Sequence, residues 1–422
     1  MKVTGIIAEY NPFHKGHEHH LIQTRKSLGS DYIIVVMSGN YVQRGAPTII
    51  DKYSRAEMAL KCGADLVLEL PACYSTASAE YFAFGGTAIL DKLNVVDHLC
   101  FGTESLDSAE EEMDFRLLTE KFAKIADLLV EEPQEYKAVL KESMKAGLSH
   151  AASASRAIGA VLGEEYVTLM ETSNNILGVQ YMRALKILGS SIKPVPIARK
   201  LSSHKDTQIT EGFSSATSIR NSIFNRYDVN SLSSTVPKSV LDILTDRYLV
   251  TFPIFRDDFS IILGEKLLSA KNCEDLTEYF AVPKDLANRF LKLRNEYRTF
   301  NQFRELSYTK NMNKATVGRA LMHITLGIKE QDMQKLYNNK ENMQAVKVLG
   351  FRESAKPLLG EIKKKADINL VTKLADYRPD PDADGVDMIE QTTRMDMLYR
   401  MVAMNKFDVE IPTPYEQEII IL

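Results

Sequence analysis

The first twenty-one residues constrain the fold more than any other part of the chain. Val3–Ala8 is an apolar run too short for a helix, and the turn-forming pair Asn11-Pro12 follows, so we expect a buried strand and a tight turn. The polar, periodic segment after it predicts the start of a helix, whose unpaired amide groups and positive dipole end attract anions. His14 and His17 are three residues apart and share one face of that first turn, and Gly16 lets a phosphate or a flat base approach the backbone.

A metal site is the main alternative for this segment, because His14, His17, His19 and His20 are half of the eight histidines of the chain. The four cysteines are scattered without CxxC spacing and HExxH is absent, which disfavours zinc. An ordinary structural role for either histidine also stays open. Phosphate binding is the interpretation we prefer, with no metal ligand assigned.

The length of 422 residues predicts two or three domains. No apolar run reaches the roughly 18 residues of a membrane span, and the chain enters a strand directly without a signal peptide, so we expect a soluble, cytoplasmic protein with no membrane partner. The net charge of −4 conceals a basic region, residues 284–319, with nine Lys or Arg against three acidic residues.

Strands and helices alternate through the first half of the chain. The apolar runs that we expect to be strands are Tyr32–Met37, Asp65–Leu70, Val95–Phe101 and the proline-containing Pro194–Arg199, which suits a sheet edge. Such alternation predicts a parallel sheet with ligands at the carboxyl ends of its strands. His14, Ser38, Glu69 and Gly102 fall at or near those ends.

A second candidate phosphate motif is Ser214–Arg220, where hydroxyl side chains crowd a predicted helix start and Arg220 follows one turn later. The alternative is a well-capped helix whose Arg220 faces solvent. Another helix is expected to begin with Ser173 or Asn174 as its N-cap.

Beyond the polar linker Asn230–Lys238, helical periodicity dominates to about residue 374, and a short strand is expected at Glu418–Leu422. Aromatic residues interleave the basic region, and such a combination can bind RNA by neutralising phosphates and stacking on bases. The ordinary interpretation, in which the aromatic side chains form a core and the charges cover it, is favoured on these residues alone.

Six motifs in fixed order give the chain a specific resemblance: GIIAEYNPFHKGH, VVMSGNYVQRGAP, GADLVLELP, FGTE, SNNILG and SATSIR. Together they resemble the bacterial tRNA(Met) cytidine acetate ligase family of the HIGH-type nucleotidyltransferase superfamily, across residues 1 to about 222 and more weakly beyond. The resemblance implies an α/β fold: a Rossmann-like nucleotidyltransferase domain with a parallel sheet (residues 1–230), followed by a mainly helical tRNA-binding domain (residues 231–422). Residues 310–328 contain fewer arginines than expected of relatives.

The activity that the resemblance implies is ATP-dependent activation of acetate to acetyl-adenylate. The acetyl group then passes to N4 of the wobble cytidine of elongator tRNA(Met), giving N4-acetylcytidine, and Mg²⁺ is expected to accompany the ATP. Two other classes compete. A small-molecule adenylyltransferase of the pantetheine-phosphate or nicotinamide-mononucleotide type would use the same chemistry but not the long basic C-terminal part, and a non-catalytic RNA-binding protein would not need intact motifs.

The resemblance also implies roles for individual residues. His14, His17 and Arg220 are expected to be catalytic. Expected ATP contacts are Ile7, Ala8, Glu9, Tyr10, Asn11, Pro12, Phe13, His14, Lys15, Gly16, His17, Glu18, His19, His20, Gly102, Asn174, Arg199, Ser215, Thr217 and Ser218. The basic residues expected to grip the tRNA together are Arg289, Lys292, Arg294, Arg298, Lys310, Lys314 and Arg319.

Overall fold

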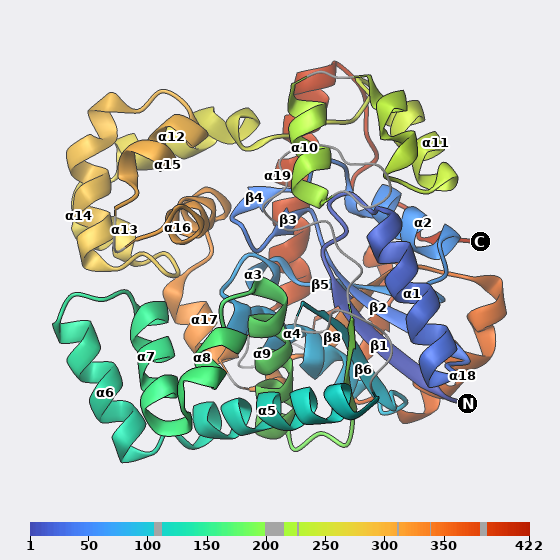
Figure 1. Ribbon diagram of the computed structural model, residues 1–422. Helices are drawn as coiled ribbons and strands as arrows, with labels where there is room; N and C mark the ends of the chain where they lie inside the picture. Colours follow the sequence, from blue (N-terminus) through green and yellow to red (C-terminus); the bar gives the residue numbers. More distant parts are fainter. Residues whose placement is uncertain (105–111, 199–214, 226–227, 310–311, 338, 380–385) are drawn as a thin grey trace.

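A computed structural model describes residues 1–104, 112–198, 215–225, 228–309, 312–337, 339–379 and 386–422. Its centre is a sheet in the order β10-β8-β5-β2-β1-β6-β7, with β9 paired to β8 (Figure 1). The strands are β1 (Val3–Ala8), β2 (Tyr32–Ser38), β5 (Leu66–Leu70), β6 (His98–Thr103), β7 (Lys193–Ala198), β8 (Ala345–Phe351), β9 (Asn369–Val371) and β10 (Ile420–Ile421).

The five strands from the first half of the chain are parallel, as predicted, and β7 lies at the sheet edge where its prolines suggested. β6 begins three residues later than the predicted strand. The expected tail strand is confirmed as β10. The sheet as a whole is mixed and not purely parallel, because β8 runs antiparallel to β5.

Helices cover both faces of the sheet because successive strand residues point to opposite sides. Ile33 and Val35 of β2 pack with one set of helices, and Ile34 and Val36 pack with the other. The first set contains α1 (Lys15–Leu28), α2 (Lys52–Lys61), α10 (Ala216–Phe224) and α11 (Lys238–Arg247); the second contains α4 (Ala79–Lys92), α5 (Glu112–Glu131) and α9 (Ser173–Leu188). The result is a three-layer α/β/α arrangement that leaves the carboxyl ends of β1 and β6 open for a site.

A helical lobe, defined here as α12–α16, stands beside this sandwich (Figure 1). Its basic segment buries Phe290, Phe300 and Phe303 completely, so those aromatic residues are core, as the ordinary interpretation held. The lobe consists of α12 (Ser260–Ser269), α13 (Cys273–Thr277), α14 (Lys284–Leu293), α15 (Phe300–Ser307) and α16 (Lys314–Leu326). The remaining elements are the hairpin β3 (Tyr41–Val42) and β4 (Ala46–Pro47), and helices α3 (Ala72–Ser75), α6 (Gln134–Lys145), α7 (His150–Leu162), α8 (Glu164–Leu169), α17 (Glu330–Leu336), α18 (Lys356–Lys365) and α19 (Met388–Phe407).

The lobe meets the sandwich through the β3–β4 hairpin. Gly45, at the hairpin turn with φ 61°, lies so close to α16 that a Cβ built on it would stand 2.2 Å from the carbonyl carbon of Gly318. Any side chain at Gly45 would clash with the α16 backbone, whereas a Cβ on Gly318 would lie 3.1 Å from the Arg44 carbonyl oxygen. The hairpin therefore fixes where the lobe sits relative to the sheet.

Helical periodicity was expected to dominate residues 240–374 and to form a mainly helical domain, and this is wrong at Ala345–Phe351. This segment forms β8, which pairs with β5 and completes the sheet of the N-terminal half. Its partner lies in the first quarter of the chain, so no local hairpin or βαβ signal marks it as a strand. The division into domains at residue 230 stays a prediction.

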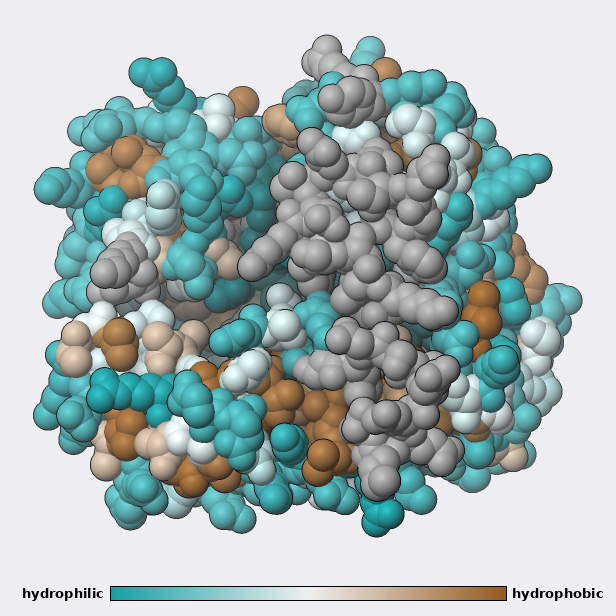
Figure 2. All heavy atoms as spheres, viewed as in Figure 1, coloured by the Kyte–Doolittle hydropathy of each residue, from teal (hydrophilic) through white to brown (hydrophobic). Residues whose placement is uncertain are grey.

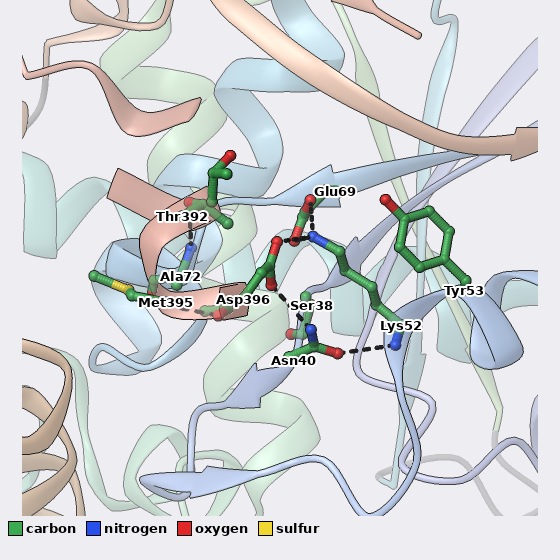
Figure 3. A network of polar contacts seen from close by, with 12 residues as sticks. Ser38, Asn40, Lys52, Tyr53, Glu69, Ala72, Thr392, Met395 and Asp396 are labelled. Atoms are coloured by element: carbon green, nitrogen blue, oxygen red, sulfur yellow. Dashed lines mark hydrogen bonds and ion pairs between the residues drawn. The ribbon is translucent and has the colours of Figure 1, made fainter. Parts of the chain in front are cut away.

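A buried ionic network ties the last long helix to this sheet (Figure 3). Lys52 Nζ at the start of α2 donates to both carboxylate oxygens of Glu69 at 2.6 Å and also contacts Asp396 of α19. Asn40 Nδ2 donates to the other oxygen of Asp396 at 2.9 Å. All three charged side chains are at most 5% exposed, so the network locks α19 against the carboxyl ends of β2 and β5.

Candidate functional site

The turn after β1 builds the first part of the site. His14 is the N-cap of α1: its Nδ1 accepts from Gly16 N–H at 3.1 Å, and Nδ1 of His17 accepts from His14 N–H at 3.3 Å. The two imidazole rings stack with centroids 3.7 Å apart, so both histidines stand on one side of the turn, as predicted. A Cβ on Gly16 would lie 2.9 Å from His14 Cε1, which gives this glycine a second purpose, to make room for the ring.

The second predicted motif lies directly against the first. Ser215 caps α10 by accepting from Ser218 N–H, which confirms the expected helix start. Arg220 donates from Nη1 to the carbonyl of Asn11 at 2.7 Å and from Nη2 to Thr217 Oγ1 at 3.1 Å. Its guanidinium faces the turn instead of solvent, which excludes the alternative drawn from the sequence.

Two further strand ends contribute to the site. Gly102 of β6 lies beside the start of α9, where Asn174 Nδ2 donates to Glu104 Oε1 at 2.5 Å. The predicted N-cap is wrong by one or two residues, since Thr172 is the N-cap and α9 begins at Ser173. The shift leaves Asn174 in the first turn, where its side chain reaches the end of β6.

A cavity of about 910 Å³ unites these parts. The predicted nucleotide contacts that line it are Ile7, Ala8, Glu9, Tyr10, Asn11, His14, Gly16, His17, His19, His20, Gly102, Asn174, Ser215 and Thr217, together with Arg220. The predicted contacts that do not line it are Pro12, Phe13, Lys15, Glu18 and Ser218. Arg199 lies outside the described residues.

The excluded contacts have structural tasks. Phe13 is completely buried against the rings of Tyr10 and His17. Lys15 donates from Nζ to the carbonyl of Ser234 at 2.7 Å, so it points to the loop before α11 and away from the cavity. Ser218 is buried and donates to the Ser215 carbonyl.

Three arginines that sequence reasoning did not select also line the cavity: Arg44, Arg256 and Arg304. Arg256 donates to the carbonyls of Arg44 and Gly45, both at 2.8 Å. Burial, together with the positive charges of Arg304, Arg220 and Arg44, lowers the pKa of Arg256 to about 9. Burial, followed by the charge of Arg44, likewise lowers the pKa of Arg220 to about 10. These cations are held close together although they repel, which prepares the cavity for a polyanion.

The described residues among those predicted to bind tRNA divide into three groups. Lys314 and Arg319 line the cavity. Arg289 and Arg294 instead donate to main-chain carbonyls within the lobe, including that of Ser307 at 2.7 Å from Arg289 Nε. Lys292 and Arg298 are exposed outside the cavity lining, and Lys310 lies outside the described residues.

No metal or membrane site emerges from the described residues. Within them, no group of three or more His, Cys, Asp or Glu side chains is placed to hold a metal ion. In the same part of the chain, no helix combines the length and the apolar character needed to cross a bilayer. Glu9, whose Oε1 accepts from Gln43 N–H at 2.9 Å, is the one carboxylate among the described residues lining the cavity.

The family model of the HIGH Nucleotidyl Transferases matches residues 1–410. The chain belongs to this family. The matched range includes the histidine turn between β1 and α1. It is 38% identical over 380 residues to the tRNA(Met) cytidine acetate ligase of Caldanaerobacter subterraneus subsp. tengcongensis, with 90% of each chain covered. It is equally similar, at 38% over 383 residues and 89% of each chain, to the enzyme of that name from Acetivibrio thermocellus.

This HIGH nucleotidyl transferase is also similar to solved structures. Thermotoga maritima TmcAL bound with alpha-thio ATP superimposes with a TM-score of 0.88, at 30% identity over the whole of both chains. The apo form of the same protein gives a TM-score of 0.90. The Rossmann-like nucleotidyltransferase fold that the sequence motifs implied is thereby confirmed.

Proposed function

We propose that this chain is an ATP-dependent ligase that activates acetate as acetyl-adenylate and transfers the acetyl group to N4 of the wobble cytidine of elongator tRNA(Met). The single observation that carries the proposal is the junction of the two phosphate motifs, where Arg220 donates to the carbonyl of Asn11 beside the stacked His14 and His17. Relatives named tRNA(Met) cytidine acetate ligase over nine tenths of the chain support the substrates. The cytoplasm, where tRNA is modified, is the compartment we propose.

In the first step, a carboxylate oxygen of acetate attacks the α-phosphorus of ATP. The bond from that phosphorus to the oxygen bridging the β-phosphate breaks, and pyrophosphate leaves. Charge builds on the phosphate oxygens, so catalysis consists mainly of positioning and preorganised electrostatics. We assign His14, His17 and the amide end of α1 to the α-phosphate, and Arg220 with Thr217 to the departing pyrophosphate.

Mg²⁺ fits this site as an ion carried by the nucleotide. Magnesium sites commonly use one or two carboxylates plus substrate phosphates, and Glu9 offers one carboxylate at the cavity wall. The ion would supply neutralisation of the phosphate charge. Orientation of the nucleotide comes from the chain itself, through the α1 turn and Arg220.

In the second step, the N4 amine of cytidine attacks the acetyl carbon, the bond from that carbon to the adenylate oxygen breaks, AMP leaves, and the amine loses a proton. An exocyclic amine conjugated with its ring is a weak nucleophile, which explains the need for an activated acyl donor. The basic lobe beside the cavity is the part we propose holds the tRNA, whose unpaired anticodon base can be read by its edge and by stacking.

The test combines two measurements on the same preparation. Acetate-dependent exchange of pyrophosphate into ATP reports the first step, and ATP-dependent labelling of N4-acetylcytidine in bacterial tRNA reports both. His14→Ala and His17→Ala should abolish exchange, whereas His150→Ala, at the exposed start of α7, should not change it.

Wild-type exchange in both active-site variants would refute the residue assignment. Exchange without labelled tRNA, together with a dinucleotide product, would identify a small-molecule adenylyltransferase. No ATP-dependent turnover, combined with tight RNA binding, would leave a non-catalytic RNA-binding protein.

A further inference from the structure

An exposed aromatic side chain lies in the cavity without a task in nucleotide activation. Phe224 is 59% exposed and lines the cavity near the end of α10, one turn after Arg220. Its ring meets that of Phe255 edge to face, with centroids 5.2 Å apart and planes at 84°. An apolar ring left in water does not gain the free energy of burial. Because this exposed ring lies in a concave site lined by charged residues, we expect a ligand to cover it.

The direction of Phe224 separates it from the nucleotide-activating end. Arg220 reaches back to the carbonyl of Asn11 at the α1 turn, whereas Phe224 contacts Phe255, the residue immediately before Arg256. Arg256 in turn holds the hairpin residue Arg44. Phe224 therefore lies one helical turn beyond Arg220, against the segment that contains Phe255 and Arg256.

The charge at this end of the cavity exceeds what a nucleotide needs. Among the described residues, Arg44, Arg220, Arg256, Arg304, Lys314 and Arg319 line the cavity together with one carboxylate, Glu9. Glu305 pairs with two of these cations, at 2.8 Å from Arg304 Nη2 and 2.5 Å from Lys314 Nζ. Among the described residues, Arg304 Nε is buried without a hydrogen-bond partner. After the triphosphate has been bound, cations of the lobe remain for further phosphates.

The surface of the molecule is consistent with cations lining the lobe's side of the cavity. Figure 2 shows the molecule hollowed beside the helical lobe, with hydrophilic residues along the lobe's side of the hollow. A groove with a positive wall and one exposed aromatic ring is the combination that binds single-stranded nucleic acid, because phosphates take the cations and a base stacks on the ring.

We propose that Phe224 is the stacking platform for the unpaired acceptor base of the RNA substrate, and that Arg304 and Arg319 of the lobe hold the phosphates flanking that base. This assignment rests on the proposed function and adds the subsite at which the acceptor nucleotide waits for the acetyl-adenylate. Asn221 and Asn301 line the same end and carry the amide donors and acceptors that reading a base edge requires. Arg289 and Arg294, expected from the sequence to contact tRNA, are replaced in this role by the cavity cations.

The aromatic part of the proposal is tested with Phe224→Leu and Phe224→Tyr. Leucine keeps apolar volume and loses the stacking face, so kcat/KM for tRNA acetylation should fall by about 5-fold to 100-fold, while tyrosine should retain it. Acetate-dependent ATP–pyrophosphate exchange should be unchanged in both variants. Ile261→Ala, at an 88% exposed apolar side chain on α12 outside the cavity, is the matched control and should change neither measurement.

The phosphate part is tested with Arg304→Gln, which should weaken the dependence of tRNA affinity on salt by about 0.7 in the log–log slope for each lost phosphate contact. Lys271→Gln removes one positive charge at an exposed site between α12 and α13, outside the cavity, and should leave the slope unaltered.

The outcomes separate the subsite from the function on which it rests. Wild-type tRNA kinetics in Phe224→Leu would overturn the stacking platform, and a raised KM for ATP in the exchange reaction would assign the ring to adenine instead. A slope altered in Lys271→Gln but not in Arg304→Gln would move the RNA to the outer face of the lobe. If the wild-type chain acetylates no tRNA, the proposed function itself fails, whatever the variants do.

Discussion

Replacing Lys52 with methionine keeps an unbranched apolar stem and removes the charge at the centre of the buried network. Lys52 Nζ lies 2.6 Å from both carboxylate oxygens of Glu69, and at an effective dielectric constant of about 20 this one charge pair gains roughly 6 kcal/mol of Coulomb attraction before desolvation is subtracted. Without the lysine, two carboxylates stay buried with their charge poorly compensated. Breaking a buried pair on one side costs about 3–5 kcal/mol, and we expect the free energy of unfolding to fall by that amount.

The matched control lies on the same helix. Lys61 forms an ion pair of 2.7 Å with Glu57 four residues earlier, and its side chain is 37% exposed. Lys61→Met should therefore cost about 0.5 kcal/mol or less. Equilibrium urea unfolding followed by circular dichroism measures both variants.

If Lys52→Met and Lys61→Met lower the free energy of unfolding equally, the argument that Lys52 compensates two buried carboxylates is refuted. Adding Glu69→Gln and Asp396→Asn to Lys52→Met removes the uncompensated charges, so part of the lost stability should return. A triple variant less stable than the single one would contradict the same argument.

Two further predictions concern the neighbouring strand and the hairpin. Burial, and then the charge of Lys52, lowers the folded-state pKa of Lys347 to about 8, below its unfolded value, so the free energy of unfolding is lowest below pH 8 and rises as the pH approaches about 10.5. Lys347→Met should therefore stabilise the fold by up to about 3 kcal/mol at pH 7 and by little above pH 10.5, as measured by urea unfolding. A variant that is destabilised at pH 7 would be the contrary result. Gly45→Ala should separate the hairpin from α16 and abolish tRNA acetylation. The control is Gly29→Ala, at a similar φ of 58° with no neighbour within 4 Å of its Cβ, which should lower the free energy of unfolding by about 1–2 kcal/mol and leave activity unchanged. Full activity in Gly45→Ala would contradict the close packing.

Local signals account for the parts of the fold that could be predicted. The strand Val3–Ala8, the turn at Asn11 and the helix capped by His14 all follow from neighbouring residues, and so does the helix that begins after Ser215. β8 could not be predicted in the same way, because an apolar run of seven residues becomes a strand only through its pairing with β5. Its burial on the sheet outweighs the helical periodicity around it.

The candidate site shows the same contrast between residues marked by local motifs and residues brought together by the fold. His14, His17 and Arg220 stand in short motifs whose chemistry is readable from their spacing. Arg256 and Arg304 lie in no such motif, and only the fold brings them to residues that are distant in the chain. Arg256, for example, donates to the carbonyl of Arg44, more than 200 residues earlier. The charge count selected a lobe whose Lys314 and Arg319 line the cavity, but it could not show that Arg289 donates to a carbonyl within the lobe itself.

The position of β8 has a consequence for how the protein is made. β5 pairs with β8 in the finished sheet, and all five residues of β5 are buried there. A ribosome adding about 5–20 residues per second synthesises β8 roughly 15–55 s after β5. Throughout that interval the nascent chain carries an apolar strand with an open edge, the kind of edge that pairs with other chains. Translation of residues 71–344, while β5 waits for β8, is therefore a stage at which this protein is exposed to aggregation and a chaperone would protect it.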